Sequence, residues 1–245
     1  MTARFDRLWP HPAENLTDDD LTSGLTAGVR VNFIASVDGA ATSDGLSGGF
    51  STPGDKRYFE LLRRVCDVVV VGAGTVRAEG YGPMRVSAAS AAWRKAREMP
   101  PHPSFAIVSG HLDLDPRSRI FTDAPVRPIV VTTTHAKGAE RFAAVADILV
   151  AGDGKHIAPR AMLAGLRERN LTHVLCEGGA SLFGSLLDAD IVDELCLTVS
   201  PTLKAGDAPR ISSGPAVSRA LRLDELHKSG DSLFLHYRRA HGAPV

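Results

Sequence analysis

The 245-residue chain has no excess of charge of either sign, because 28 lysine and arginine residues balance 28 aspartate and glutamate residues. Proteins that wrap nucleic acid or lie on an anionic membrane usually carry a basic surface, so zero net charge disfavours both activities. A small basic pocket is still compatible with this balance. We therefore expect neither a nucleic acid nor a membrane among the partners of this protein.

Cysteine is scarce, and long hydrophobic runs are absent. Cys66, Cys176 and Cys196 lie far apart inside apolar stretches, and no Cys-x-x-Cys pair occurs. This pattern disfavours a disulfide framework and favours buried, reduced thiols in a cytoplasmic protein. No apolar run approaches the ~20 residues of a membrane span, and residues 1–20 lack the apolar core of a signal peptide. The histidines form no His-x-His or His-Glu-x-x-His pair, so we expect no metal site.

The chain does contain short apolar runs that alternate with helical patterns, which predicts an α/β fold. We expect a mostly parallel central sheet with helices on both faces and antiparallel edge strands. The last two predicted strands of the chain are expected to form that edge. Residues 1–28 are predicted to be an irregular N-terminal arm, and residues 29–245 a single domain. The predicted strands are 29–37, 67–72, 104–109, 128–132, 147–150, 172–176, 192–199 and 232–237, and the predicted helices are 54–65, 86–99, 157–169 and 180–187.

Two of the predicted strands end in an acidic residue followed by glycine. Asp38-Gly39 follows the first strand, and Glu177-Gly178-Gly179 lies between a strand and a helix. Ordinary tight turns have the same appearance, but α/β sheets also bind ligands at the carboxyl ends of their strands. Free N–H groups at a helix start favour a phosphate, and paired glycines let it approach closely. Asp38 and Glu177 are therefore candidate catalytic residues.

Other glycine-rich segments match familiar motifs only in part. Gly72-Ala73-Gly74 follows a strand, but Arg77 stands where a dinucleotide fingerprint has its third glycine. Residues 45–49 read Gly-x-Ser-x-Gly, but a loop precedes the serine where a hydrolase needs a strand. Arg63 and Arg85 are ordinary surface residues unless they converge, in which case they could clamp a phosphate.

Together and in order, these segments resemble one family, the pyrimidine reductases of riboflavin biosynthesis. These form the reductase half of bifunctional deaminase–reductase proteins and have a fold like that of dihydrofolate reductase. The resemblance covers about residues 29–239. Its departures are Gly49, where the family has an aromatic residue, and Glu79-Gly80, where it has an acidic residue before proline. The matching segments are ASVDG at 35–39, FELLR at 59–63, DVVVVGAGTV at 67–76, EGGASLFG at 177–184 and VDEL at 192–195.

The resemblance implies that NADPH reduces the ribose of 5-amino-6-(5-phosphoribosylamino)uracil to a ribityl chain. A separate deaminase would supply this phosphorylated pyrimidine, and a homodimer is expected. The residues implied as substrate contacts are Ser47, Arg63, Arg85 and Glu177. Those implied as cofactor contacts are Ala35, Gly49, Gly74, Thr75, Glu79, Ser109, Gly178, Gly179, Ala180, Ser181 and Leu182.

The reaction needs a proton as well as a hydride, and Asp38 and Glu177 are both candidates to deliver it. Residues 132–137 follow a strand and offer hydroxyl and cationic groups to the 2′-phosphate of NADPH. Two alternatives stay open. One is reduction of another pterin-like or pyrimidine-like substrate, including dihydrofolate-type activity, and the other is a non-catalytic nucleotide-binding member of the fold. An assay with NADPH and the phosphoribosylamino-pyrimidine distinguishes all three.

Overall fold

A computed structural model of the chain describes residues 3–154 and 156–240, so the outermost residues of the predicted arm and domain lie outside the described residues. Two compact units emerge from its contacts. The first unit runs up to Leu62 and resumes at Glu177, and the second unit comprises Arg63–Cys176. The first boundary lies inside helix α1 (Pro53–Val65). The single domain over residues 29–245 stays a prediction.

The first unit contains a sheet of mixed direction. Strand β8 (Glu194–Ser200) is parallel to β2 (Gly28–Ser36), whereas β10 (Ser232–Arg239) is antiparallel to β8 and to β9 (Leu221–Ser229). The antiparallel edge was predicted, but β8 was wrongly assigned to it. Strand β9 was missed altogether, because its charged sequence hides the alternation typical of a strand.

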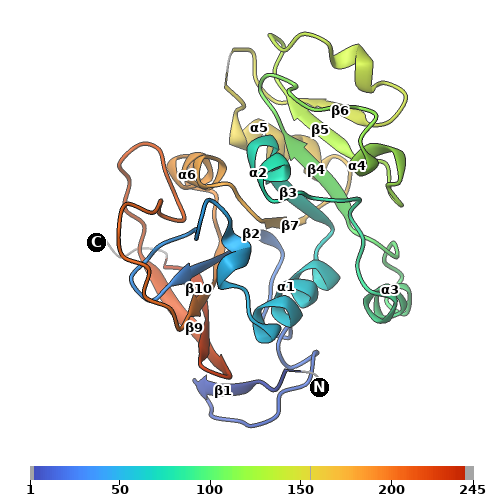
Figure 1. Ribbon diagram of the computed structural model, residues 1–245. Coiled ribbons are helices and arrows are strands. Elements are labelled where there is room, and N and C mark those ends of the chain that lie inside the picture. Colours follow the sequence, from blue (N-terminus) through green and yellow to red (C-terminus); the bar gives the residue numbers. More distant parts are fainter. Residues whose placement is uncertain (1–2, 155, 241–245) are drawn as a thin grey trace. The chain divides into compact units, whose positions relative to one another are not determined.

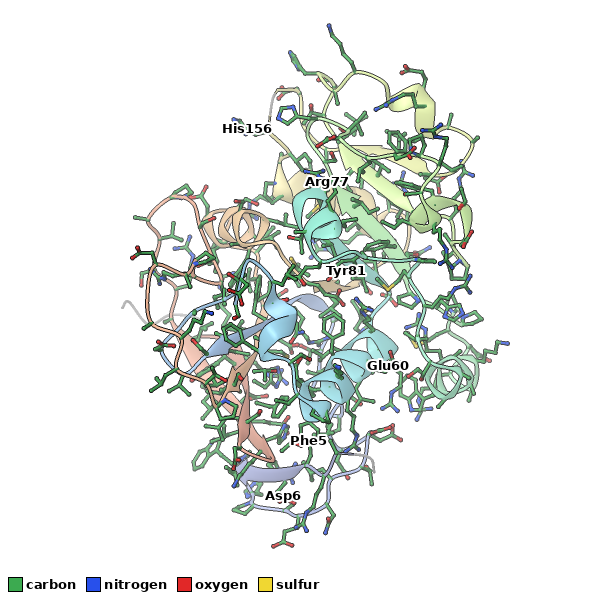
Figure 2. The ribbon with its side chains drawn as sticks, viewed as in Figure 1. Phe5, Asp6, Glu60, Arg77, Tyr81 and His156 are labelled. Carbon is green, nitrogen blue, oxygen red and sulfur yellow. The ribbon has the colours of Figure 1, made fainter. Side chains whose placement is uncertain are left out.

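The predicted irregular arm is also wrong in part, because it contributes strand β1 (Asp6–Trp9), which pairs antiparallel with β9 (Figure 1). Phe5, labelled in Figure 2, is fully buried, and its ring centroid lies 4.7 Å from that of Phe234. The guanidinium of Arg57 lies 5.4 Å from the Phe5 ring. One aromatic anchor thus holds the arm on the unit, and an isolated phenylalanine produces no periodic pattern in the sequence.

Helices cover both faces of this sheet, as predicted. On one face, Tyr58 of α1 packs edge-on against Phe234 and its hydroxyl contacts the sulfur of Cys196 at 3.6 Å. On the other face, Phe33 of β2 stacks on Phe183 of α6 (Ala180–Asp188), with ring centroids 5.0 Å apart. Successive strand residues point to opposite faces, so the strands of one sheet can pack against helices on both sides.

The second unit has a wholly parallel sheet of five strands, and the predicted α/β class is confirmed. The strand that begins at Val68 is buried on both faces, since Val68–Val71 have no exposed area. The strands, in spatial order, are β7 (His173–Cys176), β3 (Val68–Gly72), β4 (Ser104–Val108), β5 (Ile129–Thr132) and β6 (Asp147–Val150). The helices are α2 (Ala73–Ala78), α3 (Ala88–Lys95), α4 (Arg119–Thr122), η2 (Ala139–Phe142) and α5 (Pro159–Arg167).

Candidate active site

Asp38 lies just beyond the end of β2, and its carboxylate is occupied by donors from its own unit. It accepts hydrogen bonds from the hydroxyl of Ser36 at 2.5 Å and from the backbone N–H groups of Lys204 at 3.1 Å and Ala205 at 2.7 Å. These bonds lower the pKa of Asp38 to about 2, with the Ser36 hydroxyl as the largest cause. These donors stabilise the charged form of the carboxylate, and the predicted role of Asp38 as a proton donor stays a prediction.

The loop after Asp38 carries two of the predicted ligand contacts. Ser47 and Gly49 both lie in the short helix η1 (Ser47–Phe50). A Cβ atom at Gly49 would lie 3.0 Å from the Cβ of Ser43, which is tighter than ordinary van der Waals contact. The Oγ of Ser43 in turn accepts a hydrogen bond from the Nζ of Lys204 at 2.9 Å. A larger side chain at position 49 would therefore require Ser43 to move.

Glu177 immediately follows β7 and is buried, with 7% of its surface exposed. Gly178 adopts a φ of +98°, and a Cβ atom there would lie 3.3 Å from the ring of Phe33, so glycine is required on both counts. Helix α6 then begins at Ala180 with Gly179 as its N-cap, and no described side chain caps it. Its first-turn N–H groups therefore suit an anion, as the sequence predicted for Gly178–Leu182.

A segment that the sequence did not assign packs against the start of α6. The N–H of Ser213 donates to the carbonyl of Ala180 at 3.1 Å, and the Oγ atoms of Ser181 and Ser213 are 3.3 Å apart. Gly184 faces the same segment, because a Cβ atom there would lie 1.8 Å from the Ser213 carbonyl oxygen. The last glycine of the motif thus serves close packing, and Ser213 is an additional residue beside the predicted cofactor turn.

In the second unit, several predicted cofactor contacts lie at the carboxyl ends of adjacent strands. Gly72 of β3 aligns with Val108 of β4 in the ladder. Gly74 and Thr75 follow in the first turn of α2, and Glu79 ends that helix by donating its N–H to the carbonyl of Thr75 at 2.9 Å. Parallel strands bring their carboxyl ends to one edge, so this grouping follows from the predicted sheet.

The next two strands continue the same edge. Ser109 follows β4, and its carbonyl accepts a hydrogen bond from the hydroxyl of Thr132, at the end of β5, at 2.8 Å. Thr133 is 2% exposed, and its hydroxyl finds no hydrogen-bond partner among the described residues. A buried hydroxyl without a partner is costly, which marks Thr133 as a group available to a ligand.

The two predicted phosphate-binding arginines have different surroundings. Arg63, in the last turn of α1, places its guanidinium 5.8 Å from the ring centroid of Tyr81, which Figure 2 labels. Tyr81 itself stacks on Phe105 at 6.0 Å. Arg85 is exposed and donates to the backbone carbonyl of Asp123 at 2.6 Å. The predicted convergence of the two arginines therefore stays a prediction.

Three residues beside the predicted contacts were not predicted from the sequence: Lys204, Ser213 and Tyr81. Lys204 and Ser213 lie in a stretch between β8 and β9 whose described residues form no helix or strand, so no period pointed to them. Tyr81 sits where the chain departs from the family's usual residues, and that departure was its one available signal. Among residues 3–154 and 156–240, no cluster of three or more potential ligands could hold a metal, and no helix could span a membrane.

The fold defines the chain as an α/β domain of the dihydrofolate reductase-like class. A crystal structure of a pyrimidine reductase-like protein from Corynebacterium diphtheriae has 25% identical residues and a TM-score of 0.81, over 91% of this chain and 98% of that one. A family model described as the RibD C-terminal domain matches residues 27–235, so the chain belongs to that family. The predicted family and fold are thereby confirmed.

Two curated relatives place this family in riboflavin biosynthesis. A 2,5-diamino-6-ribosylamino-4(3H)-pyrimidinone 5′-phosphate reductase of Archaeoglobus fulgidus is 27% identical over 83% of this chain and 94% of its own length. The riboflavin biosynthesis protein RibD of Mycobacterium tuberculosis is 26% identical over 84% of this chain but only 53% of its own length. The chain is accordingly an oxidoreductase of riboflavin biosynthesis.

Proposed function

We propose that the chain reduces the ribose of 5-amino-6-(5-phosphoribosylamino)uracil to a ribityl group, with NADPH as the reductant. The observation that carries this proposal is the buried Glu177 at the end of β7, directly before the uncapped start of α6. A carboxyl group and an anion-binding helix start are what a phosphorylated, hydrogen-bonding substrate and its cofactor require.

A second substrate is favoured by the name of the Archaeoglobus relative, which this chain matches over nearly its full length. That relative is named for a 2,5-diaminopyrimidinone, which carries an amino group where the uracil has a carbonyl oxygen. Steady-state oxidation of NADPH with each pyrimidine, and with dihydrofolate as a third arm, decides the substrate. Higher kcat/KM for the uracil supports our proposal, higher kcat/KM for the diaminopyrimidinone replaces the substrate, and activity on dihydrofolate alone refutes both. Tight NADPH binding without turnover on any of them indicates a non-catalytic member of the fold.

The described residues fit a nicotinamide dinucleotide. The unpartnered hydroxyl of Thr133 lies at the strand edge, no described atom lies within 4 Å of the Cβ position of Gly74, and the first N–H groups of α6 are uncapped. In the first unit, residues 178–182 are the proposed contacts of the pyrophosphate. In the second unit, taken by itself, Ser109 and Thr132–Thr134 are proposed cofactor contacts. When bound, NADPH supplies the hydride that reduces C1′ of the opened ribose.

Each unit contributes separately to the proposed reaction. In the first unit, Glu177 orients the pyrimidine or its sugar and moves a proton at its carboxyl oxygen, because Asp38 is committed to other donors. In the second unit, Arg63 provides a positive charge for the ribose phosphate, and Tyr81 holds its guanidinium by a cation–π contact. The predicted contact at Arg85 is retained as a proposal for the same phosphate.

The role of Glu177 is testable by Glu177→Gln, which keeps the shape of the side chain but cannot move a proton. We expect kcat to fall by at least about tenfold, since positioned acids and bases contribute about 10²–10⁴-fold. Binding of NADPH, followed by its fluorescence, is expected to persist. Exposed Glu168→Gln is the matched control. Full turnover by the Glu177 variant would remove this residue from the mechanism.

The preference for NADPH over NADH is a separate proposal that rests on the hydroxyl-rich residues 132–134. Measuring kcat/KM with both cofactors tests it, and we expect a clear preference for NADPH. Thr133→Val removes the unpartnered hydroxyl while preserving the shape of the side chain. It should raise the KM for NADPH and so reduce the ratio of kcat/KM with NADPH to kcat/KM with NADH. Equal efficiencies in the wild-type protein would contradict the preference.

We also propose that the chain forms a homodimer through the sheet of its first unit. On the face opposite α1, Leu235 of β10 pairs with Leu197 of β8 and with Leu226 of β9, and all three are only half-buried. Such a row favours a covering partner. Light scattering should give the mass of a dimer, and Leu235→Lys should give a monomer. A cytoplasmic location is proposed because the three buried cysteines are thiols rather than disulfides, and cell fractionation tests it.

A further inference from the structure

The carboxylate of Asp38 joins segments that are distant in the sequence. Besides the hydroxyl of Ser36, it accepts the N–H groups of Lys204 and Ala205, which belong to the irregular stretch after β8. That stretch is also tied by a hydrogen bond from the N–H of Val37 to the carbonyl of Thr202 at 2.9 Å. Asp38 therefore determines where the backbone of Lys204 lies.

The side chain of Lys204 extends this connection to a second loop. Its Nζ donates to the Oγ of Ser43 at 2.9 Å and lies 3.9 Å from a carboxylate oxygen of Asp44. The Asp44 side chain is 93% exposed, so that ion pair contributes little, and the hydrogen bond to Ser43 is the more specific contact. The lysine ammonium is thus held against the start of the loop.

Ser43 contacts the part of the loop that carries the predicted ligand contacts. Its N–H and carbonyl both pair with Leu46, at 2.9 and 3.1 Å, which closes a turn immediately before Ser47. A Cβ atom added at Gly49 would lie 3.0 Å from the Cβ of Ser43, so a side chain there would require movement. Any displacement of Ser43 therefore reaches both Ser47 and Gly49.

We propose that Asp38 and Lys204 form a positioning relay that holds the 43–49 loop in place for the phosphorylated pyrimidine, with Asp38 having no part in proton delivery. This inference rests on the proposed function, because it takes Ser47 and Gly49 as ligand contacts. In this proposal Lys204 controls the affinity for the substrate. Asp38 is a positioning residue rather than a proton donor.

Two variants test the relay kinetically. In Asp38→Asn, the amide NH2 group meets the N–H donors of Lys204 and Ala205, and in Lys204→Met the ammonium is lost. For each we expect the KM for the pyrimidine to rise about tenfold while kcat changes less than about threefold, the signature of lost binding rather than lost chemistry. The pH profile of kcat should not move, and Lys204→Arg should recover most of the affinity. Asp207→Asn, an exposed residue of the same stretch, is the matched control.

A double variant and an activity-independent measurement complete the test. Residues of one relay are coupled, so Asp38→Asn combined with Lys204→Met should raise KM no further than either single change. Amide hydrogen exchange of residues 43–50, measured without ligand, should quicken in both single variants and stay unchanged in the control. A fall in kcat beyond about a hundredfold at constant KM in Asp38→Asn would restore its role as proton donor and overturn the relay. Additive KM changes, or unchanged exchange, would overturn it as well. If the wild-type protein reduces neither pyrimidine, the proposed function fails, and the exchange result alone decides whether the relay exists.

Discussion

His227 should make the stability of this protein depend on pH over an unusually acidic window. The residue is 1% exposed in β9, and neither ring nitrogen has a hydrogen-bond partner among the described residues. Its Nε2 lies 3.7 Å from a carboxylate oxygen of Glu225, beyond hydrogen-bonding distance. Burial, with smaller contributions from Arg7 and His236, lowers the pKa of His227 from 6.5 to about 4. The folded protein thus holds this imidazole neutral.

The direction and size of the change in stability with pH follow from proton linkage. Below pH 6.5 the unfolded chain takes up a proton that the folded chain refuses until about pH 4, so stability is present above 6.5 and lost as the pH falls to 4. A shift of roughly 2.5 units at 1.36 kcal/mol each corresponds to about 3 kcal/mol of unfolding free energy. Burial also raises the pKa of Glu225, so the folded chain binds that proton more readily than the unfolded chain, which partly offsets this loss. A single stability curve therefore mixes the two groups.

A comparison of variants isolates the histidine. Urea unfolding of the wild-type protein and of His227→Gln is measured at pH 7 and at pH 4, and only the change between the two pH values is compared. We expect the loss to be smaller in His227→Gln by about 3 kcal/mol, whatever the stability of that variant at pH 7. His111→Gln, at an exposed position, serves as the control. An equal loss in wild type and His227→Gln would refute the interpretation that His227 is held neutral.

Three further predictions concern packing and charge. Arg30→Met leaves the buried carboxylate of Glu194 without the guanidinium that donates to it at 2.7 Å, so urea unfolding should show a loss of about 3–5 kcal/mol, and Arg30→Met/Glu194→Met should lose less. Gly184→Ala places a Cβ atom 1.8 Å from the Ser213 carbonyl and should cost about 1–3 kcal/mol by thermal unfolding; an unchanged melting temperature would show that the 213 segment moves freely. Tyr81→Leu removes the ring 5.8 Å from an α1 guanidinium, so the KM for the pyrimidine should rise about two- to fivefold at similar kcat, whereas Tyr81→Phe should not change it.

Much of the fold could be predicted because its signals are local. The continuous apolar run at 68–71 predicted a strand whose residues are buried, and the helical period at 54–65 predicted α1. The elements that were missed depend on distant contacts. Strand β1 exists because Phe5 reaches Phe234, and β9 because it pairs with β1 and β10.

The candidate site divides in the same way. The sequence by itself determined which strand ends carry a carboxylate and glycines, and the order of those motifs determined the family, because both are properties of neighbouring residues. It could not separate the roles of Asp38 and Glu177, since both appeared as acids at strand ends. The difference that we propose rests on the tertiary structure. It brings the N–H groups of residues 204 and 205 onto Asp38 and lowers its pKa to about 2, and contacts made across 166 residues of chain leave no trace in local sequence.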